Sequence, residues 1–406
     1  MKPPGSPGTP TTAPVLELRN LHVTYGQDVH AVRGVDLTLA AGQKLGVAGE
    51  SGCGKSTLAL ALLRLLPASA KLTGEILLDG EDVLTMKWGR LRAVRWAGAS
   101  IVFQGAMHSL NAVHRIGDQI AEPVLTHRQA TPAAARRRAG ALLEQVGLPA
   151  ARADAYPHEL SGGQRQRVMI AMSLACDPHL IVADEPTTAL DVMIQAQILR
   201  LIERLVADQN ISLLMISHDL AVLADTCDRL AVMYAGRVVE EGPAGDVLTR
   251  AQHPYGRALS AAFPRVGDLA SRRAPRGLPG DPPDPAGLPS GCTFHPRCAV
   301  SLASCTTDDQ PLRAAGPSHR AACVHVGTTA PPGPVGTTAP PGPPAADRTT
   351  PPGEVVPPAQ PPGGVMPPAR SAGDVVPPAQ SPGGDIPPAP PPTAAPARPE
   401  EGTERP

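Results

Sequence analysis

The chain has 406 residues, a formal net charge of −1 and 50 unevenly placed prolines. This length allows two or three domains, but the prolines exclude a globular fold for much of the chain, and the charge balance gives no basic field that would recruit nucleic acid. The longest apolar run, residues 58–66, is too short to cross a membrane and contains Arg64, so the chain is expected to be soluble by itself.

The first segment predicted to fold begins near Val15. Residues 1–14 are rich in Pro, Gly and Thr and lack both an apolar period and the features of a signal peptide, which predicts a disordered arm. Residues 15–18 and 37–39 alternate apolar and polar side chains, as half-buried antiparallel strands do, around a turn at Tyr25 and Gly26.

A loop suited to binding phosphate follows the next predicted strand. Residues 44–48 predict a short buried strand, and residues 57–66 predict an apolar helix that ends before a proline. The residues between and overlapping them fit the P-loop pattern: Gly49, Glu50, Ser51, Gly52, Cys53, Gly54, Lys55, Ser56 and Thr57. The glycines let backbone N–H groups approach phosphates, the helix N-terminus favours the same anions, and the lysine adds a mobile charge. The motif therefore predicts a nucleoside triphosphate as ligand.

Two predicted elements separate the P-loop from the next motif. Residues 100–103 form a short apolar strand that ends immediately before Gln104. Residues 131–146 are rich in alanine and arginine and predict a helix. The arginine run at 136–138 is expected to be a solvated face of that helix rather than a binding patch.

A second anion site is predicted where the following helix begins. Four consecutive residues, Ser161, Gly162, Gly163 and Gln164, lie at the start of a helix expected to run through Met172. Backbone N–H groups at a helix N-terminus bind anions, but this site and the P-loop cannot plausibly serve the same nucleotide. The alternative is that the serine is only a helix N-cap.

Two more buried strands deliver acidic residues and a histidine. Residues 180–183 are apolar and end at Asp184 and Glu185, and residues 213–217 end before His218. Ligands of open α/β sheets collect at the C-terminal ends of the strands. We therefore expect these side chains to lie beside the P-loop.

In this order the motifs resemble the nucleotide-binding subunit of an ATP-binding cassette (ABC) transporter, with a match from about residue 15 to residue 242. The resemblance implies an α/β fold: a P-loop NTPase (RecA-like) core with an antiparallel β subdomain and an α-helical subdomain. The expected boundaries are an arm at 1–14, an ABC ATPase domain at 15–250 with its helical subdomain at about 88–165, a cysteine-containing extension at 251–326 and a tail at 327–406.

The resemblance also implies roles for residues around ATP. Tyr25 would stack on adenine, and Mg²⁺ would be held by Asp184 with help from Ser56 and Gln104. Glu185 would orient or deprotonate the attacking water, and His218 would contact the γ-phosphate, which is the positioning that phosphoryl transfer requires. With Gln104, these last two residues form the expected catalytic set.

Paired cassettes are a further implication of the resemblance. Residues 161–164 would face the ATP held by a second ATPase subunit, either the same chain or a related one. Asp191 matches the loop that communicates between paired cassettes. One chain would then supply half of each ATP site.

Residues 253–259 and 291–298 resemble the C-terminal extension of oligopeptide and dipeptide importer ATPases. This implies a peripheral subunit at the cytoplasmic face of the cell membrane, which hydrolyses ATP to power peptide uptake. Two permeases and, indirectly, an extracytoplasmic peptide-binding protein would be its partners, and nucleic acid would not. The alternatives are an importer ATPase for nickel or sugars, a soluble ABC ATPase outside transport, and a non-catalytic interaction subunit.

Four of the seven cysteines lie in this extension: Cys292, Cys298, Cys305 and Cys323. In a reducing compartment such clusters are more often metal ligands than disulfides, and the surrounding Pro-rich loop has little apolar content to hold it together. An iron-sulfur cluster is the first expectation, zinc the second, and free or disulfide-linked cysteines the third. A metal centre in the extension is expected to be structural or regulatory, because nothing connects it to the phosphates. With metal present, Cys298→Ser should release it and loosen the extension while leaving the nucleotide affinity nearly unchanged.

The tail from about residue 327 is a repetitive, Pro-rich segment. Its few apolar residues are separated by Pro-Pro pairs, which favour extended polyproline II and prevent a core. We predict a disordered, dispensable extension, and the alternative is a docking site for a polyproline-binding partner.

Overall fold

The computed structural model describes residues 14–26, 28–105, 109–127, 130–262 and 277–327. The chain divides into two compact units, of which Met1–Thr338 contains every described residue. Nearly all of the predicted arm and tail therefore lies outside the described residues. Within the described ranges, no helix is both long and apolar enough to cross a membrane.

One of two β-sheets is antiparallel, with the strand order β2-β1-β4-β5. Its strands are β1 (Pro14–Tyr25), β2 (Val29–Ala40), β4 (Ala70–Leu78) and β5 (Glu81–Asp82). Leu16 lies opposite Leu39 and Leu18 opposite Leu37, which confirms the antiparallel pair predicted from the alternating pattern.

The other sheet has eight strands in the order β11-β12-β10-β9-β3-β8-β7-β6. In chain order they are β3 (Lys44–Ala48), β6 (Ala99–Val102), β7 (Leu180–Asp184), β8 (Ser212–Ser217), β9 (Arg229–Tyr234), β10 (Arg237–Pro243), β11 (Arg313–Gly316) and β12 (His319–Ala321). Strands β9, β3, β8, β7 and β6 are parallel, and β10, β12 and β11 are antiparallel. The strands predicted from apolar runs all lie in this sheet, each within one residue of its expected bounds.

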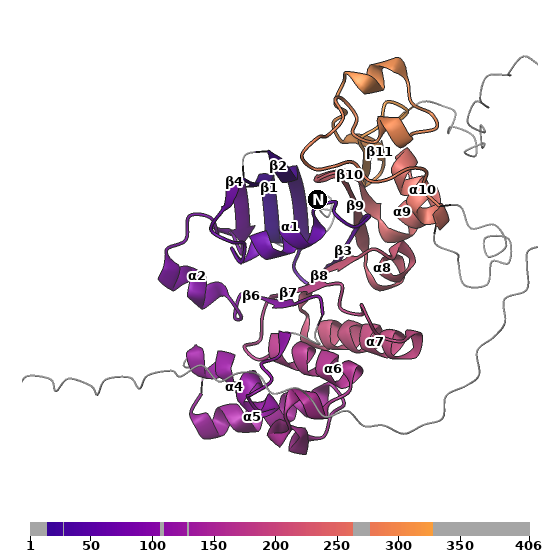
Figure 1. Ribbon diagram of the computed structural model, residues 1–406. Coiled ribbons are helices and arrows are strands. Elements are labelled where there is room, and N and C mark those ends of the chain that lie inside the picture. Colours follow the sequence, from indigo (N-terminus) through magenta and orange to yellow (C-terminus); the bar gives the residue numbers. More distant parts are fainter. Residues whose placement is uncertain (1–13, 27, 106–108, 128–129, 263–276, 328–406) are drawn as a thin grey trace, which may run out of the picture. The chain divides into compact units, whose positions relative to one another are not determined.

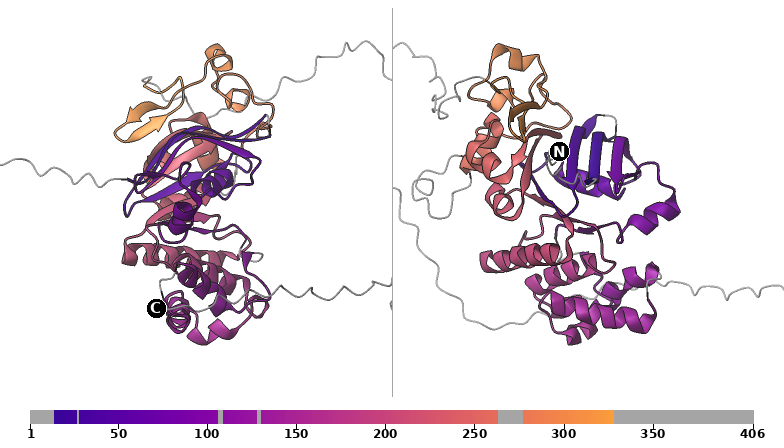
Figure 2. Two further views of the ribbon diagram at one scale, coloured as in Figure 1. Left: turned by 90° about the vertical axis from the view of Figure 1, so that its left-hand side faces the viewer. Right: turned by 180° about the vertical axis from the view of Figure 1, so that it is seen from behind.

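The described helices join and cover these strands. They are α1 (Lys55–Leu62), α2 (Trp88–Val94), α4 (Ile116–Thr126), α5 (Pro132–Gln145), α6 (Gly162–Ser173), α7 (Val192–Gln209), α8 (Leu220–Thr226), α9 (Ala244–Arg250) and α10 (Pro254–Ala262), with short 3₁₀ turns η1 (Ala150–Asp154), η2 (Pro157–Glu159), η3 (His295–Arg297) and η4 (Ala303–Thr306). Figure 1 and both views of Figure 2 show α4 to α7 on the opposite side of β6 to β8 from strands β1, β2 and β4.

The five parallel strands of this sheet are buried on both faces, which explains why they are nearly continuous apolar runs. Along β8, Leu214 and Ile216 join a core with the antiparallel sheet and α1, whereas Leu213 and Met215 join a core with the helices of the other side. All four side chains are fully buried. The loops at the strand ends are therefore held by two cores at once.

Two helices test the predicted boundaries. Helix α5 begins after Thr131, whose side chain accepts a hydrogen bond from the Ala134 N–H, in agreement with the predicted helix. Helix α1 begins earlier than predicted, at Lys55. It also ends earlier, because Arg64 adopts φ 48° and the Leu65 N–H bonds to the Leu60 carbonyl. This left-handed C-terminal cap ends a helix even where the sequence stays apolar.

The arginine run on α5 only partly forms the expected solvated face. Arg136 is half-exposed and pairs with Asp154 at the surface. Arg138 instead donates to the Ala175 carbonyl over 2.7 Å and pairs with Asp177 over 2.7 Å. The expectation is therefore wrong for Arg138, which joins α5 to the end of α6 and the start of β7.

The C-terminal extension adds two strands to the main sheet. Strand β12 pairs with β10, so that Glu240 faces Ala321 and Glu241 faces Arg320. Glu240 is fully buried and accepts hydrogen bonds from His319 Nε2 (2.8 Å) and from the backbone N–H groups of Gln252 and His253 (2.6 and 3.0 Å).

An aromatic cluster fixes the same extension from another side. The Phe294 ring is 2% exposed and lies with its centroid 5.3 Å from that of Tyr234 and 5.4 Å from that of Tyr255. Edge-on aromatic pairs of this kind add to the energy of burial. The sequence expectation that little apolar content holds the extension is therefore wrong.

Candidate functional site

The P-loop lies between the end of β3 and the start of α1. Gly54 has φ 103°, and a Cβ there would lie 2.2 Å from the Ala31 carbonyl oxygen, so only glycine fits. Lys55 is 5% exposed, and its Nζ donates to the carbonyls of Gly49 (2.7 Å) and Glu50 (2.9 Å). The ammonium group is thus held inside the loop that the sequence predicts to bind phosphates.

Asp184 ends β7 beside this loop. Its carboxyl is buried, the Oδ1 atom has no hydrogen-bond partner, and Ser56 on the first turn of α1 donates to the carboxylate. Burial raises the pKa of Asp184, and the hydrogen bond from Ser56 lowers it in part. An unpartnered, buried carboxylate oxygen next to a hydroxyl is a donor set that fits Mg²⁺.

Glu185, the next residue, brings the predicted catalytic residues together. Its Oε2 atom accepts hydrogen bonds from Gln104 Nε2 (3.0 Å) and Thr188 Oγ1 (2.8 Å), and its Oε1 atom lies 3.4 Å from His218 Nδ1. The backbone of Glu185 has φ 45°, a conformation that non-glycine residues adopt rarely and that clusters at functional sites. Thr188 is a contact that the sequence analysis did not identify.

Tyr25 lies near the same loop. Its hydroxyl group donates to Thr57 Oγ1 over 3.4 Å, and its ring packs against the core formed with α1. The last residue of β1 is therefore placed at the start of the P-loop helix, where a nucleotide base could reach it.

The second predicted anion site forms a complete helix cap. Ser161 Oγ accepts from the Gln164 N–H (3.3 Å), and Gln164 Oε1 accepts from the Ser161 N–H (3.0 Å). A Cβ on Gly163 would lie 2.7 Å from Ile194 at the start of α7. Asp191 caps that helix by accepting from the Ile194 N–H over 3.0 Å. The proposed N-cap is therefore present, and it leaves the remaining first-turn N–H groups for an anion.

The extension contacts the P-loop directly, contrary to the sequence expectation. Arg297 forms a two-point ion pair with Glu50, with distances of 2.7 Å from Nη1 to Oε2 and 3.0 Å from Nη2 to Oε1. The Glu50 N–H also donates to the Tyr255 hydroxyl over 2.9 Å. The expectation that nothing connects the extension to the phosphate site is therefore wrong.

The four cysteines of the extension lie in one neighbourhood, and the Cys292 N–H donates to the Cys305 carbonyl over 2.9 Å. Burial is the main cause that raises the pKa of the Cys292, Cys298 and Cys323 thiols, that of Cys298 to about 11. Among the described residues, which include all four cysteines, no three His, Cys, Asp or Glu side chains converge closely enough to hold a metal ion. In this structure the cysteines therefore do not fit the expected four-thiolate centre.

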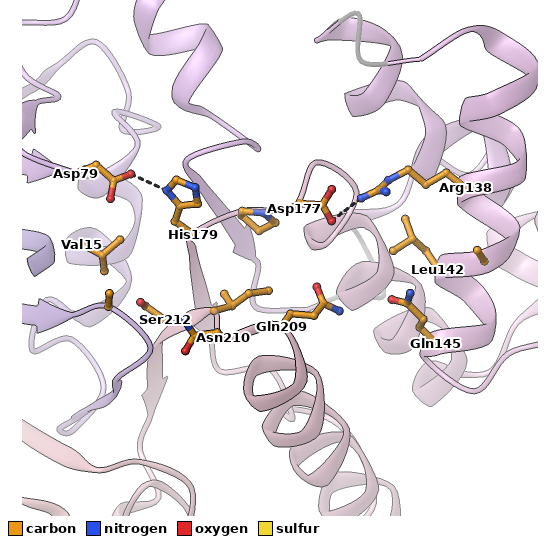
Figure 3. Close-up of a pocket in the computed structure, with 14 residues that line it drawn as sticks. Val15, Asp79, Arg138, Leu142, Gln145, Asp177, His179, Gln209, Asn210 and Ser212 are labelled. Carbon is orange, nitrogen blue, oxygen red and sulfur yellow. Dashed lines mark hydrogen bonds and ion pairs between the residues drawn. The ribbon is translucent and has the colours of Figure 1, made fainter. Parts of the chain in front are cut away.

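A cavity of about 570 Å³ lies at the opposite edge of the sheet (Figure 3), where β7 and β8 begin. Asp79 pairs with His179 there over 2.9 Å, and Asp177 pairs with Arg138. None of the predicted ATP-site residues lines this cavity. Its charged groups are already paired with one another, so these residues present no unpaired charge to a ligand.

Comparisons with known proteins agree with the geometry. The family described as "ABC transporter" matches residues 32–188, and the family described as "Oligopeptide/dipeptide transporter, C-terminal region" matches residues 239–305. The chain is 42% identical over 325 residues to the oligopeptide transport ATP-binding protein OppD of Salmonella typhimurium, a match that covers 78% of this chain and 96% of that protein. It is 45% identical over 300 residues to a protein of Brucella abortus named as a peptide import ATP-binding protein, covering 72% and 90%.

Solved structures give the same fold. The ATP-binding cassette MJ0796, a dimer bound to ADP and phosphate, is 28% identical with a TM-score of 0.51, and the match covers 56% of this chain and 98% of that one. The protein cbiO1 of Clostridium perfringens, part of the complex cbiONQ, is 28% identical with a TM-score of 0.51, covering 58% and 91%.

Proposed function

This chain belongs to the ATP-binding subunits of ABC transporters, and on that basis we propose that it hydrolyses ATP to power the uptake of di- and oligopeptides through permease partners. The single observation that carries the ATPase activity is the convergence of Gln104, His218 and Thr188 on the carboxylate of Glu185. The similarity of the extension to peptide-transporter ATPases supports the substrate class.

Each part of the site has a proposed role in phosphoryl transfer. The P-loop N–H groups and Lys55 bind the phosphates, and Tyr25 stacks on the base. Mg²⁺, when held by Asp184 and Ser56 with Gln104 nearby, supplies neutralising charge for the phosphate oxygens. Glu185 orients the attacking water and accepts its proton, because neutral donors hold its carboxylate without neutralising it.

His218 would contact the γ-phosphate from the end of β8. Its Nδ1 atom lies against Glu185, which leaves Nε2 to donate a hydrogen bond to a phosphate oxygen. This placement supports a contact with the γ-phosphate rather than a structural role.

Permeases are the partners that the family membership implies, and the chain acts in association with the membrane. More specifically, we propose a second ATPase subunit, two permeases and an extracytoplasmic peptide-binding protein, at the cytoplasmic face of the membrane. In this pairing, residues 161–164 and Asp191 face the ATP of the second subunit. The expected division into arm, ATPase domain, extension and tail is part of the same proposal.

A metal centre at the four cysteines is a proposal that only the sequence supports. An iron-sulfur cluster comes first and zinc second, because four clustered thiols in a short segment suit either. Anaerobic purification followed by iron, sulfide and zinc analysis tests it, and a metal-free, colourless protein with a folded extension would reject it.

The function is tested by isolating the native membrane complex and identifying its subunits. The complex, in proteoliposomes with its binding protein, should take up labelled peptides only with ATP inside, and a complex carrying Glu185→Gln should not. Uptake of nickel or sugars instead of peptides would contradict the substrate class. Absence of any permease from the complex would favour a soluble ATPase outside transport.

A further inference from the structure

Glu50, the second residue of the P-loop, is held from three sides. Its backbone N–H donates to the Tyr255 hydroxyl (2.9 Å), its carbonyl accepts from Lys55 Nζ (2.9 Å), and its carboxylate forms the two-point ion pair with Arg297. One residue thus joins the ammonium group inside the phosphate loop to the guanidinium group of the extension. A displacement of Glu50 would move an acceptor of Lys55.

Arg297 is itself fixed by two carbonyls of the extension and by Tyr234 of β9. Its Nε atom donates to the Pro279 carbonyl (2.8 Å), Nη2 donates to the Gly280 carbonyl (3.1 Å), and Nη1 donates to the Tyr234 hydroxyl (3.3 Å). The side chain is only 7% exposed, and the Glu50 side chain is 21% exposed. A planar guanidinium with this many fixed acceptors has one geometry, so it holds the carboxylate in place rather than following it.

The extension also covers the outer side of the loop. Residues 50–53 of the P-loop line a cavity of about 280 Å³ together with Tyr234, Ala235 and the extension residues 282–285. The two parts therefore border a common cavity beside the ion pair.

We propose that Arg297 is a positioning residue for the ATP site. Through Glu50 it holds the P-loop in the conformation that receives phosphates, so that the C-terminal extension contributes to nucleotide affinity. The proposal rests on the ATP site of the proposed function, and it assigns Arg297 no contact with ATP. It reverses the sequence expectation that a disturbed extension leaves nucleotide affinity unchanged.

The test measures equilibrium binding of the fluorescent nucleotide trinitrophenyl-ATP to the full chain. Arg297→Met should raise the Kd about tenfold, within the usual range of coupling between two sites. Arg297→Lys should have a smaller effect, because lysine keeps the charge but cannot bind the carboxylate at two points. Glu50→Gln should resemble Arg297→Met, and the double variant should bind no more weakly than either single variant, since both break the same pair.

Arg320→Met is the matched control. Arg320 lies in the same extension but pairs with Glu241 of β10, away from the P-loop. This variant should stay within about twofold of the wild-type Kd. An equal loss of affinity in Arg320→Met and Arg297→Met would show that any loosening of the extension is sufficient, and would overturn the specific role.

Hydrogen exchange gives a readout that needs no nucleotide. In Arg297→Met the backbone amides of residues 49–55 should exchange faster, while those of β3 should be unchanged. If Arg297→Met does not fold, Arg297→Lys decides the matter by the same measurement. Wild-type affinity and wild-type exchange in folded variants would overturn the proposal. A wild-type chain that binds no nucleotide would instead contradict the proposed function. The exchange data would still show whether Arg297 holds the P-loop in place.

Discussion

The ATP-site edge of the main sheet and the joint between β10 and the extension use buried charge differently. At the edge, Asp184 has a carboxylate oxygen with no partner, and Glu185 accepts from Gln104 and Thr188 and lies 3.4 Å from His218 Nδ1. At the joint, Glu240 is satisfied by a histidine and two backbone N–H groups. Unsatisfied groups suit a site that completes itself with a ligand, whereas satisfied groups suit a permanent contact.

The largest effect at the ATP-site edge is expected from a substitution of Glu185. Glu185→Gln should lower ATP turnover by about 100-fold or more in the assembled transporter, because the amide keeps the size of the side chain but cannot accept a proton from water. ATP binding should remain. Steady-state ATPase assays together with nucleotide binding measure both quantities, and near-normal turnover would rule out the assigned role.

At the joint, the largest effect is expected on stability and not on turnover. His319→Ala removes a donor from the fully buried Glu240 carboxylate and should lower the free energy of unfolding by about 3 kcal/mol. Urea unfolding of the full chain measures this change. A fall in stability below about 1 kcal/mol would show that the two backbone N–H groups suffice for Glu240.

Lys55→Ala sharpens the description of the ATP-site edge. A hydrogen bond to a charged group is worth about 1.5 to 3 kcal/mol, so nucleotide affinity should fall roughly 10- to 100-fold. Stability should change little, because the ammonium group bonds only to loop carbonyls and a thiol. Titration with ATP measures the affinity, and a thermal melt measures the stability. A large loss of stability would show that Lys55 holds the folded loop together rather than binding the nucleotide.

The joint should also respond to pH through His253. Burial lowers the pKa of His253 to about 3, and the neighbouring Arg257 adds to this shift, while the ring bonds to the backbone of Ala322. The unfolded chain, with a histidine pKa of about 6.5, binds more protons between these values. The contribution of neutral His253 to the free energy of unfolding is therefore fully present above pH 6.5. It falls by about 1.4 kcal/mol per pH unit as the pH drops from 6.5 toward 3.

His253→Gln should make this slope shallower by about that amount between pH 6.5 and 4.5, because glutamine keeps a hydrogen-bond acceptor but does not titrate. The nearby Glu240 and His319 are present in both proteins, so their contribution cancels in the difference. Equal slopes for the variant and the wild type in urea unfolding would contradict the shift.

The smallest effect is expected at a surface pair. Arg136 pairs with Asp118 and Asp154, with side chains that are each more than half exposed. Arg136→Met should change the free energy of unfolding by less than about 1 kcal/mol, because solvent screens exposed pairs. Urea unfolding measures this change. A larger change would mean that the exposure of an ion pair does not predict its contribution to the stability of this protein.

The sequence predicts the ATP-site edge well for a physical reason. Each motif consists of a buried strand and the residues that follow it. Both can be identified from a short apolar segment of the sequence and the polar residues at its end. The strands before Gly49, Asp184 and His218 are found as expected, and the parallel order of the sheet brings their ends together.

The misses have equally specific causes. The end of α1 depends on the left-handed backbone of Arg64, which apolar periodicity does not reveal. The pair between Glu50 and Arg297 joins residues separated by 247 positions and has no local pattern. The clustering of four cysteines in a short segment predicts a metal centre, but it carries no information on how the thiols are oriented.

The place of β12 in the main sheet has a consequence for any shorter form of this protein. Strand β12 covers β10, whose backbone N–H and C=O groups would otherwise form an open edge. An uncovered edge strand pairs readily with another chain, and here it would also expose the Glu240 carboxylate. An ATPase domain cut before the extension should therefore self-associate on purification, even though every residue of its catalytic set is retained.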